Sequence, residues 1–373
     1  MKITRIAVEH REIPLDPPFP PSWDSRPRTR FAATITRVET DEGLVGVGSG
    51  DLMLGLEGHE DLFVGQDPRD LDRHFRVIEN LSFHYGRCWP LDFALWDIAA
   101  QAAGLPVWRL LGGCSPRVRL YASSGVLRAP EALAEQAERF VAEGFPAMKI
   151  RFHRADWRDD VKALETVRKA VGDRIAIMVD CNQAWRMPWD VKPAWTLKDA
   201  LAVARHLEDL DVYWMEEPLH RADIDGMASL RKMTRLRIAG GEMAREMHDI
   251  DRLIDGVGTG RAVDILQPDA AVIGGITGLS RIARTAQARG VTFTPHTWGN
   301  GLGLLANAHL VAGTVGGDPE AGGGCPWLEW PHDPPEWSAA NGRDFLLAEE
   351  LTADGKGFYT LPDKPGWGVG LAG

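Results

Sequence analysis

Three carboxylate side chains each follow a short apolar segment of the kind that forms a buried β-strand. They are Asp180 after residues 175–179, Glu216 after residues 212–215, and Glu242 after residues 238–241, of which the last two are glycines. If these strands are parallel neighbours, the carboxylates converge on one rim, where their repulsion would raise at least one pKa unless a cation is bound. Oxygen ligands without Cys or His at these strand ends suit a hard ion, Mg²⁺ first and Mn²⁺ second. Taken singly, each acid would be interpreted as a helix N-cap or a solvated side chain, so the metal hypothesis depends on the set.

A cationic face is expected on the strand around residue 150. A period of two places Lys149, Arg151 and His153 on one face of this strand, and Ile150 and Phe152 on the other. In a barrel the polar face points inward, so the three cationic side chains would face a ligand beside the metal. A lone inward lysine is as often only a salt-bridge partner, and this alternative stays open for Lys149.

An acidic and an imidazole side chain close two further apolar segments, Asp269 the earlier one and His296 the later one. An Asp that accepts the imidazole N–H fixes the tautomer and makes the other nitrogen more basic, so His296 would be a general base near neutral pH. The structural alternative is a buried His–Asp pair that only stabilises the fold. We assign no function to histidines within helical stretches, such as His206, His248 and His309.

These residues belong to a regular series of short apolar segments separated by amphipathic stretches. The segments are residues 118–122, 147–152, 175–179, 212–215, 236–239, 263–266, 291–294 and, more weakly, 327–330. Such alternation predicts repeated βα units with a parallel sheet, which is an α/β fold. Eight units predict a (β/α)8-type barrel over residues 118–339, whose active site is built at the carboxyl ends of the strands.

The beginning of the chain has a different pattern. Residues 2–13 and 30–50 are typical of strands, and the second stretch is a hairpin around a turn at residues 40–43. Residues 14–23 are rich in proline, which predicts an irregular loop between the strands.

A helical segment completes this first domain. Residues 90–103 have apolar side chains at helical spacing and are followed by Gly104, which predicts a buried helix. We therefore expect an α+β domain over residues 1–117. The glycine- and proline-rich tail is too polar to form its own domain, so residues 340–373 are expected to pack back onto the first one.

The composition disfavours several classes of function. A formal net charge of −11 argues against nucleic-acid binding, which relies on clustered Lys and Arg. No apolar stretch approaches the roughly 20 residues of a membrane helix, and the amino terminus has no signal-peptide pattern. The four cysteines form no C-x-x-C pair, which argues against a zinc cluster or a disulfide framework and fits a reducing compartment. We expect a cytoplasmic protein whose partner is a small molecule, without nucleic-acid or membrane partners.

In their order along the chain, the motifs resemble the enolase superfamily, in particular its mandelate racemase-like branch of acid-sugar dehydratases and racemases. They are Pro90-Leu91-Asp92-Phe93-Ala94-Leu95-Trp96-Asp97, Leu110-Leu111-Gly112-Gly113, Lys149-x-Arg151, Val179-Asp180-x-Asn182, Met215-Glu216-Glu217-Pro218, Gly240-Gly241-Glu242, Gln267-Pro268-Asp269, Gly274-Gly275-Ile276-Thr277, Pro295-His296 and Trp327-Leu328-Glu329. The resemblance spans nearly the whole chain.

The resemblance implies roles for individual residues. It implies metal ligation by the three carboxylates and a catalytic acid/base dyad of His296 and Asp269, which act with Mg²⁺ on an ene-diolate intermediate. It also implies that Glu329 forms a hydrogen bond with the substrate carboxylate. The amino-terminal domain would cap the barrel, with loops near residues 17–23 and 51–58 shaping specificity.

Two departures narrow the expected reaction. The second strand of the family commonly reads Lys-x-Lys, with the second lysine as a base, but Arg151 stands there in this chain. A guanidinium cannot accept a proton at neutral pH, which disfavours a racemase with two bases. No lysine occurs between Lys232 and Lys356, which removes the sixth-strand lysine of the muconate-cycloisomerase and dipeptide-epimerase branch.

The resulting hypothesis is a Mg²⁺-dependent dehydratase that eliminates water from a polyhydroxy carboxylate. His296 would remove the α-proton, and its imidazolium, or else His153, would protonate the departing β-hydroxyl to give a 2-keto-3-deoxy acid. Lys149 and Arg151 would neutralise substrate charge. The alternatives are an epimerase or racemase that pairs His296 with Lys149 or His153, a Schiff-base enzyme that uses Lys149, and a binding protein without turnover.

Substrate identity stays open at this stage. Candidates for contact with the substrate are Trp23, Leu52, Met53, His153, Asn182 and Trp298. The stretch 186–196, rich in Trp and Pro, either lines the pocket or packs outside it. A homo-oligomer is the default for a soluble enzyme of this kind.

Overall fold

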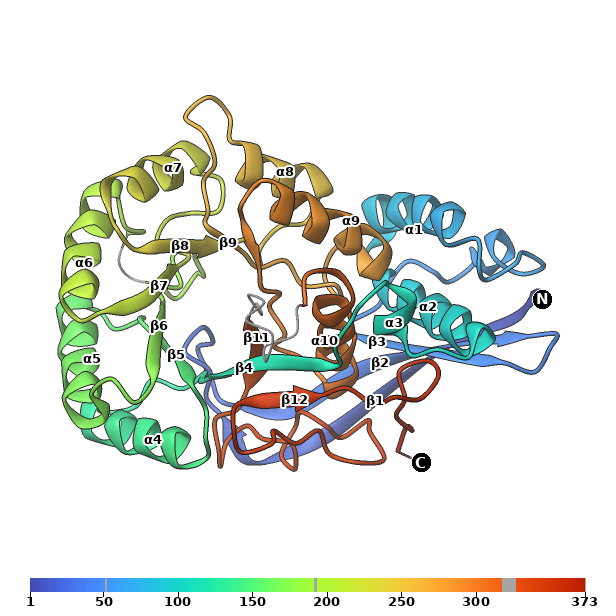
Figure 1. The fold of residues 1–373 in the computed structure, drawn as a ribbon, viewed down its shortest axis with the longest axis horizontal. Helices are drawn as coiled ribbons and strands as arrows, with labels where there is room; N and C mark the ends of the chain where they lie inside the picture. The colour runs from blue at the N-terminus through green and yellow to red at the C-terminus, as the bar shows by residue number, and fades with distance from the viewer. Residues whose placement is uncertain (51, 191–192, 317–326, 373) are drawn as a thin grey trace.

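A small antiparallel sheet with helices lies beside a ring of strands enclosed by helices (Figure 1). The computed structural model describes residues 1–50, 52–190, 193–316 and 327–372. It has the predicted α/β architecture, a (β/α)8-type barrel with an amino-terminal capping unit.

The amino-terminal unit is a three-stranded sheet in the order β1-β2-β3, covered by helices. Its elements are β1 (Ile3–Phe19), β2 (Arg28–Thr40), β3 (Val45–Gly50), the short 3-10 helix Glu60–Leu62, α1 (Leu71–Tyr85), α2 (Trp89–Ala103) and α3 (Val107–Leu110). The expected buried helix is α2, which has Pro90 in its first turn and ends at Gly104 in the left-handed conformation, with a φ of 66°. Because α2 packs against β3 on one side and against a barrel helix on another, it is apolar around most of its circumference.

The prediction of an irregular loop over residues 14–23 was wrong for its first part. Residues 14–19 continue β1, which pairs with β2 as far as Pro14 and again at Phe19 after a register shift. Since β1 is an edge strand, a proline there can point its missing N–H side away from the neighbouring strand.

The barrel alternates strands and helices from residue 117 onward. Its elements are β4 (Arg117–Ser123), α4 (Pro130–Ala142), β5 (Ala147–Arg151), α5 (Trp157–Val171), β6 (Ala176–Asp180), α6 (Leu197–Asp209), β7 (Val212–Glu216), α7 (Ile224–Met233), β8 (Arg237–Gly240), α8 (Met247–Asp255), β9 (Ile265–Leu266), α9 (Gly275–Ala288), β10 (Thr292–Phe293), α10 (Gly301–Thr314) and β11 (Trp327–Pro331). The parallel strand order is β11-β4-β5-β6-β7-β8-β9-β10. Each strand overlaps one of the eight predicted apolar segments.

Side-chain contacts complete the ring where its two end strands meet. No ladder pairs β10 with β11 among the described residues. Thr297, just after β10, instead donates from its backbone N to Glu329 Oε2 (2.9 Å) and from Oγ1 to Glu329 O (2.8 Å). The interior is filled by a buried cluster that includes Tyr121, Ala147, Met178, Trp214, Ala239, Ile265 and Trp327. The barrel is therefore a packed core, and its chemistry has to lie at the strand ends.

The amino-terminal unit is attached to the barrel at several places, two of which bear on the site. Near the strand ends, Ser22 N donates to Gly125 O (2.8 Å), just after β4. Farther out, the carboxylate of Asp92 on α2 accepts hydrogen bonds from the backbone N (3.0 Å) and Oγ1 (2.6 Å) of Thr277 on α9. These contacts fix the first unit over the rim where the catalytic groups are expected.

The carboxyl-terminal tail returns to the amino-terminal unit, and Figure 1 shows the C-terminus on the same side of the molecule as the N-terminus. β12 (Phe358–Thr360) pairs antiparallel with β4. Beyond it, Trp367 N donates to Asp97 Oδ1 (3.1 Å), and Trp367 Nε1 donates to Val47 O (2.7 Å).

Two further features concern the described residues as a whole. None of their helices combines the length and the apolar character needed to cross a bilayer. Cys88, Cys114 and Cys181 are free thiols, while Cys325 lies outside the described residues.

Candidate active site

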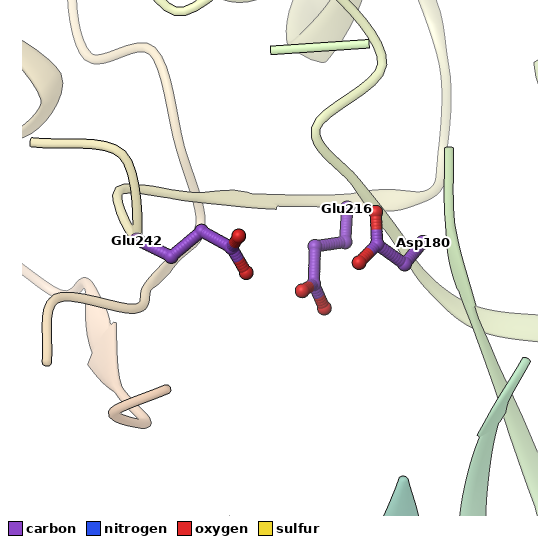
Figure 2. Close-up of side chains that lie close together, drawn as sticks. All are labelled: Asp180, Glu216 and Glu242. Carbon is purple, nitrogen blue, oxygen red and sulfur yellow. The ribbon is translucent and has the colours of Figure 1, made fainter. Parts of the chain in front are cut away.

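The three carboxylates at the strand ends lie together on one rim of the barrel. Asp180 is the last residue of β6, Glu216 is the last residue of β7, and Glu242 follows the end of β8. Because β6 and β7 are parallel neighbours with Asp180 opposite Glu216, these two side chains emerge next to each other. One ligand oxygen from each of the three residues lies within 4.8 Å of the others, and Figure 2 shows Glu216 between the other two.

This set of donors fits a hard divalent ion. All three side chains are buried, and burial is the largest cause that raises each of their pKa values. Glu242 Oε2 is buried and accepts no hydrogen bond. Oxygen ligands lie about 2.1 Å from Mg²⁺, so ligands on opposite sides of the ion are about 4.2 Å apart. Ligands at adjacent positions are about 3.0 Å apart. Small side-chain movements would bring the three oxygens to adjacent or opposite positions around one ion, and the residues present therefore fit Mg²⁺.

Neighbouring polar groups hold the carboxylates in place. The backbone N of Asn182, a residue with a φ of 51°, donates to Asp180 Oδ1 (2.8 Å). Gln267 Nε2 and Trp214 Nε1 both donate to Glu216 Oε2, at 2.9 and 3.1 Å. The side-chain amide of Asn182 is buried without a hydrogen-bond partner, so it retains free donors and an acceptor close to the carboxylates.

Two cations from β5 neutralise part of this acidic cluster. Lys149 Nζ lies 2.6 Å from Glu216 Oε1, 2.8 Å from Glu329 Oε1 and 3.9 Å from Asp180 Oδ2. The guanidinium of Arg151 forms a buried ion pair with Asp180. Burial lowers the pKa of Lys149, but the charges of Glu216 and Glu329 outweigh burial and raise that pKa. These ion pairs favour the protonated form of Lys149, which has no lone pair with which to accept a proton.

The predicted imidazole–carboxylate pair is formed between the ends of β9 and β10. His296 Nδ1 lies 3.0 Å from Asp269 Oδ2, while Asp269 Oδ1 accepts hydrogen bonds from Asn307 Nδ2 and Ala271 N, both at 2.9 Å. The other ring nitrogen, Nε2, lies 3.8 Å from Glu242 Oε2, so it faces the carboxylate cluster. Burial lowers the pKa of His296, but the surrounding carboxylates, Glu242 first, outweigh burial and raise it to about 9.

Glu329 lies at the end of the ring beside β4. Its Oε1 accepts a hydrogen bond from Ser123 Oγ (2.7 Å) as well as the ion pair from Lys149, and its Oε2 accepts one from Thr297 N. Burial raises the pKa of Glu329. The positive charge of Lys149 and, to a smaller extent, those of His296 and Arg151 outweigh burial and lower this pKa to about 2. This arrangement suits a carboxylate that holds Lys149. It does not supply the proton that a hydrogen bond to a substrate carboxylate would require.

Aromatic side chains form one wall of the cavity above the carboxylates. The cavity has a volume of about 740 Å³ and is lined by His296, Glu242 and Arg151 among others. Trp23 and Trp298 line it as well, with the Trp23 ring 4.8 Å from the Arg151 guanidinium and 5.3 Å from the Trp298 ring. Both tryptophans predicted to contact the substrate therefore lie in this cavity.

His153 is not brought to the same cavity. The period of two holds only within β5, which ends at Arg151, and the chain then leaves the barrel wall. His153 lies in another cavity of about 570 Å³, with Nε2 3.3 Å from Asp190 Oδ1. The structure thus gives His153 no contact with His296 or with the carboxylate cluster.

The stretch 186–196, whose role the sequence left open, and the loop at residues 51–58, expected to shape specificity, contribute unequally. In the stretch 186–196, Arg186 and Met187 line the cavity of His296, whereas Trp189 and Trp195 line the cavity of His153; residues 191 and 192 lie outside the described residues. Of the loop at residues 51–58, Leu52 lines a third cavity and Met53 is buried. Residue 51 is also outside the described part of the chain.

Sequence reasoning missed several residues of the site. Ser123 directly follows the first apolar segment, and the same position after an apolar segment identified the carboxylates. In the structure, the Ser123 hydroxyl accepts a hydrogen bond from Trp298 Nε1 (2.9 Å). Arg221 and Arg245 line the cavity and follow Glu216 and Glu242 by a few residues. Their position shortly after strand ends could have indicated them, but only the structure shows that their side chains reach the cavity.

Two family domains match the chain. Residues 132–372 match a domain described as enolase C-terminal domain-like, and residues 3–112 match the mandelate racemase / muconate lactonizing enzyme N-terminal domain. The chain belongs to the enolase superfamily, in its mandelate racemase-like branch. The expected resemblance is confirmed.

Enolase-superfamily proteins of several activities are similar to this chain. The D-galactarolactone cycloisomerase of Agrobacterium fabrum is 30% identical, over 99% of this chain and 96% of its own length. The L-talarate/galactarate dehydratase of Salmonella typhimurium is 31% identical, over 77% of this chain and 72% of its own. A crystal structure of an L-talarate/galactarate dehydratase mutant liganded with Mg and L-glucarate has a TM-score of 0.82 at 26% identity, covering all of this chain and 90% of that one. Other relatives are named racemases and epimerases, so these likenesses support superfamily catalysis without selecting one reaction.

Proposed function

We propose that this enolase-superfamily member is a Mg²⁺-dependent dehydratase of an acid sugar, which removes the α-proton and eliminates the β-hydroxyl. The observation that carries the proposal is the asymmetry of the site. His296 comes from β10 and is held by Asp269, and a cation bound to Glu242 would offset the charge that raises the pKa of His296, so that the imidazole could accept a proton. Lys149 and Arg151 come from β5, on the other side of the carboxylates, and are both held as cations. One base and two cations suit elimination, which needs a single proton acceptor.

The three carboxylates would hold the ion. A bound Mg²⁺, or Mn²⁺ as the second choice, would supply a Lewis acid that binds the substrate carboxylate and makes the α-proton more acidic. The similar structures include an L-talarate/galactarate dehydratase mutant liganded with Mg and L-glucarate, which supports this assignment.

His296 performs both proton transfers in the proposed reaction. Nε2 accepts the α-proton while Asp269 keeps the Nδ1–H in place and stabilises the imidazolium. The same imidazolium then donates its proton to the β-hydroxyl, which leaves as water. The remaining enol tautomerises to a 2-keto-3-deoxy acid, so the substrate is converted into this acid and one water molecule. Arg151 lines the cavity, where it can hold negative charge on the substrate. Lys149 is fully buried and contributes its charge from beside Glu216 and Glu329, and Glu329 positions it.

The nearest alternative that an observation favours is a cycloisomerase. The first relative named above is a cycloisomerase of a sugar lactone, and the same base could eliminate a ring oxygen in place of a hydroxyl. A racemase or epimerase would need a second base facing His296, which a protonated Lys149 and a guanidinium do not provide.

The test is a screen of acyclic and cyclic sugar acids for 2-keto acid formation with Mg²⁺ present. His296→Asn should abolish turnover while it leaves Mg²⁺ binding intact, and His248→Asn, at an exposed position on α8, is the matched control. Full turnover by His296→Asn would contradict the assignment. Uptake of solvent deuterium without a 2-keto product would identify an epimerase. Conversion of cyclic acids alone would identify a cycloisomerase, and tight binding without conversion would identify a binding protein.

A further inference from the structure

The cavity above the carboxylates has an excess of positive charge. Among the described residues, its lining contains five arginines and a single carboxylate, Glu242, which is a candidate metal ligand; the arginines are Arg28, Arg151, Arg186, Arg221 and Arg245. Three of the five have a carboxylate within salt-bridge distance. These pairs are Arg28 with Asp24 (3.1 Å), Arg151 with Asp180, and Arg186 with Asp190 (3.8 Å).

The other two arginines have only neutral partners in the described part of the chain. Arg221 Nη1 donates to Ala184 O (3.2 Å) and lies 3.4 Å from His220 Nε2. Arg245 Nη1 donates to the backbone oxygens of Ala244 (2.9 Å) and Glu242 (3.3 Å). A guanidinium has five N–H donors, so both groups are anchored by one edge and keep further donors for a ligand.

Arg221 and Arg245 are also close enough to repel each other. The charge of Arg221 acts on Arg245, and Glu242 and Asp269 offset part of this repulsion. Both arginines line the cavity of His296 and the adjoining cavity of about 330 Å³. An anion bound by both would remove this repulsion and use the free donors, and a carboxylate matches the planar fork of a guanidinium.

The positions of Arg221 and Arg245 in the fold indicate where they lie relative to the reacting end of the substrate. Arg221 follows β7 and Arg245 follows β8, the strands that carry Glu216 and Glu242. The bond from Arg245 to the Glu242 backbone keeps one guanidinium next to the metal-binding rim. A sugar acid whose first carboxylate lies at that rim would thus extend along the cavity toward the two arginines.

We propose that Arg221 and Arg245 form a second anion site and that the substrate is a dicarboxylic acid sugar, whose distal carboxylate binds there. This inference rests on the proposed function for the identity of the reacting end. It goes further by distinguishing a diacid from a monoacid. An uncharged terminal hydroxymethyl group would leave the two arginines without an ion-pair partner.

The experiment compares a dicarboxylic with a monocarboxylic sugar acid of the same length and configuration. Wild type should favour the diacid in kcat/KM, and Arg221→Gln and Arg245→Gln should each reduce the diacid-to-monoacid ratio by about 10- to 100-fold, as expected for loss of a hydrogen bond to a charged group. Arg221→Lys should recover part of the ratio because it restores the charge. Arg235→Gln is the matched control, since the Arg235 side chain is 87% exposed and does not line the cavity.

A binding measurement separates this inference from the dehydratase proposal. Calorimetric titration of the diacid and the monoacid into His296→Asn, with and without Arg221→Gln, reports recognition without turnover. Diacid binding that weakens selectively upon Arg221→Gln would support the anion site even if no sugar acid is dehydrated. Equal affinities for the two acids, or equal losses for both in the Arg221 and Arg245 variants, would overturn it. Thermal denaturation of each variant verifies that it is folded.

Discussion

Magnesium should stabilise this protein against heat by an amount that can be worked out from the site. An ion that binds only the folded state adds about 2.7 kcal/mol at 100 times its Kd and about 4.1 kcal/mol at 1,000 times. With an unfolding entropy of roughly 2.1 cal/mol/K per residue, 373 residues give about 0.8 kcal/mol/K. The Tm should therefore rise by about 3 to 5 °C between chelator and saturating Mg²⁺.

The size of this shift should increase with pH. In the metal-free protein, burial raises the pKa values of Asp180, Glu216 and Glu242 above their ordinary values. A carboxyl group of this kind binds more protons in the folded state than in the unfolded state. Its contribution to the free energy of unfolding is therefore fully present below the ordinary carboxyl pKa, and it is lost as the pH rises through the raised pKa of the folded state. Mg²⁺ requires the deprotonated acids and removes the repulsion between them. The gain in Tm should therefore be smaller near pH 5 than near pH 8.

The assay is scanning calorimetry of the wild type and of Asp180→Asn at both pH values, in chelator and in Mg²⁺. Asp180→Asn removes one ligand charge and should lose most of the Mg²⁺ shift. Glu165→Gln, at an exposed position on α5, should keep it. An equal shift in Asp180→Asn and wild type, or no shift in wild type at millimolar Mg²⁺, would refute the reasoning that the three carboxylates form a metal site.

Two substitutions test the groups around this centre. Asp269→Asn should lower turnover by about two to four orders of magnitude, because the hydrogen bond that fixes the His296 tautomer is lost; activity close to wild type would contradict the dyad, and Mg²⁺ affinity serves as the control. Asp92→Ala should lower the free energy of unfolding, measured by urea denaturation, because it leaves two donors of Thr277 unsatisfied at the interface of α2 and α9. The expected loss is about 1 to 3 kcal/mol for each donor. A total loss below about 1 kcal/mol would show that this contact does not secure the capping unit.

The barrel and its acidic rim were predictable because both depend on short-range patterns. A parallel strand that is buried on both faces is a nearly continuous apolar segment, so its end is marked by the first charged residue, as Met215 followed by Glu216 illustrates. The topology then brings such ends together, since the parallel strands of a barrel all point the same way. The metal-site prediction required no knowledge of side-chain conformations, only the order of the strands.

Features that depend on side-chain direction or on tertiary context could not be predicted in this way. The proline-rich stretch after Pro14 has the composition of a loop, but as the edge of a three-stranded sheet it can remain extended. The expected inward position of His153 assumed that β5 continues two residues farther than it does. Among the described residues, the side chains of Arg221 and Arg245 form hydrogen bonds only with neutral groups, and no local sequence pattern encodes this tertiary arrangement.

The motif residues that most clearly indicate the superfamily include some that do no chemistry. The carboxylate of Asp92, in the α2 motif, accepts two hydrogen bonds from Thr277 in the motif that begins α9, and Trp96 Nε1 donates to the same Thr277 hydroxyl (2.8 Å). A side chain at Gly275 would collide with the carboxylate of Asp92. These two motifs are far apart in the sequence and fit only each other. They hold the capping unit on the barrel, which allows Trp23 to reach the cavity.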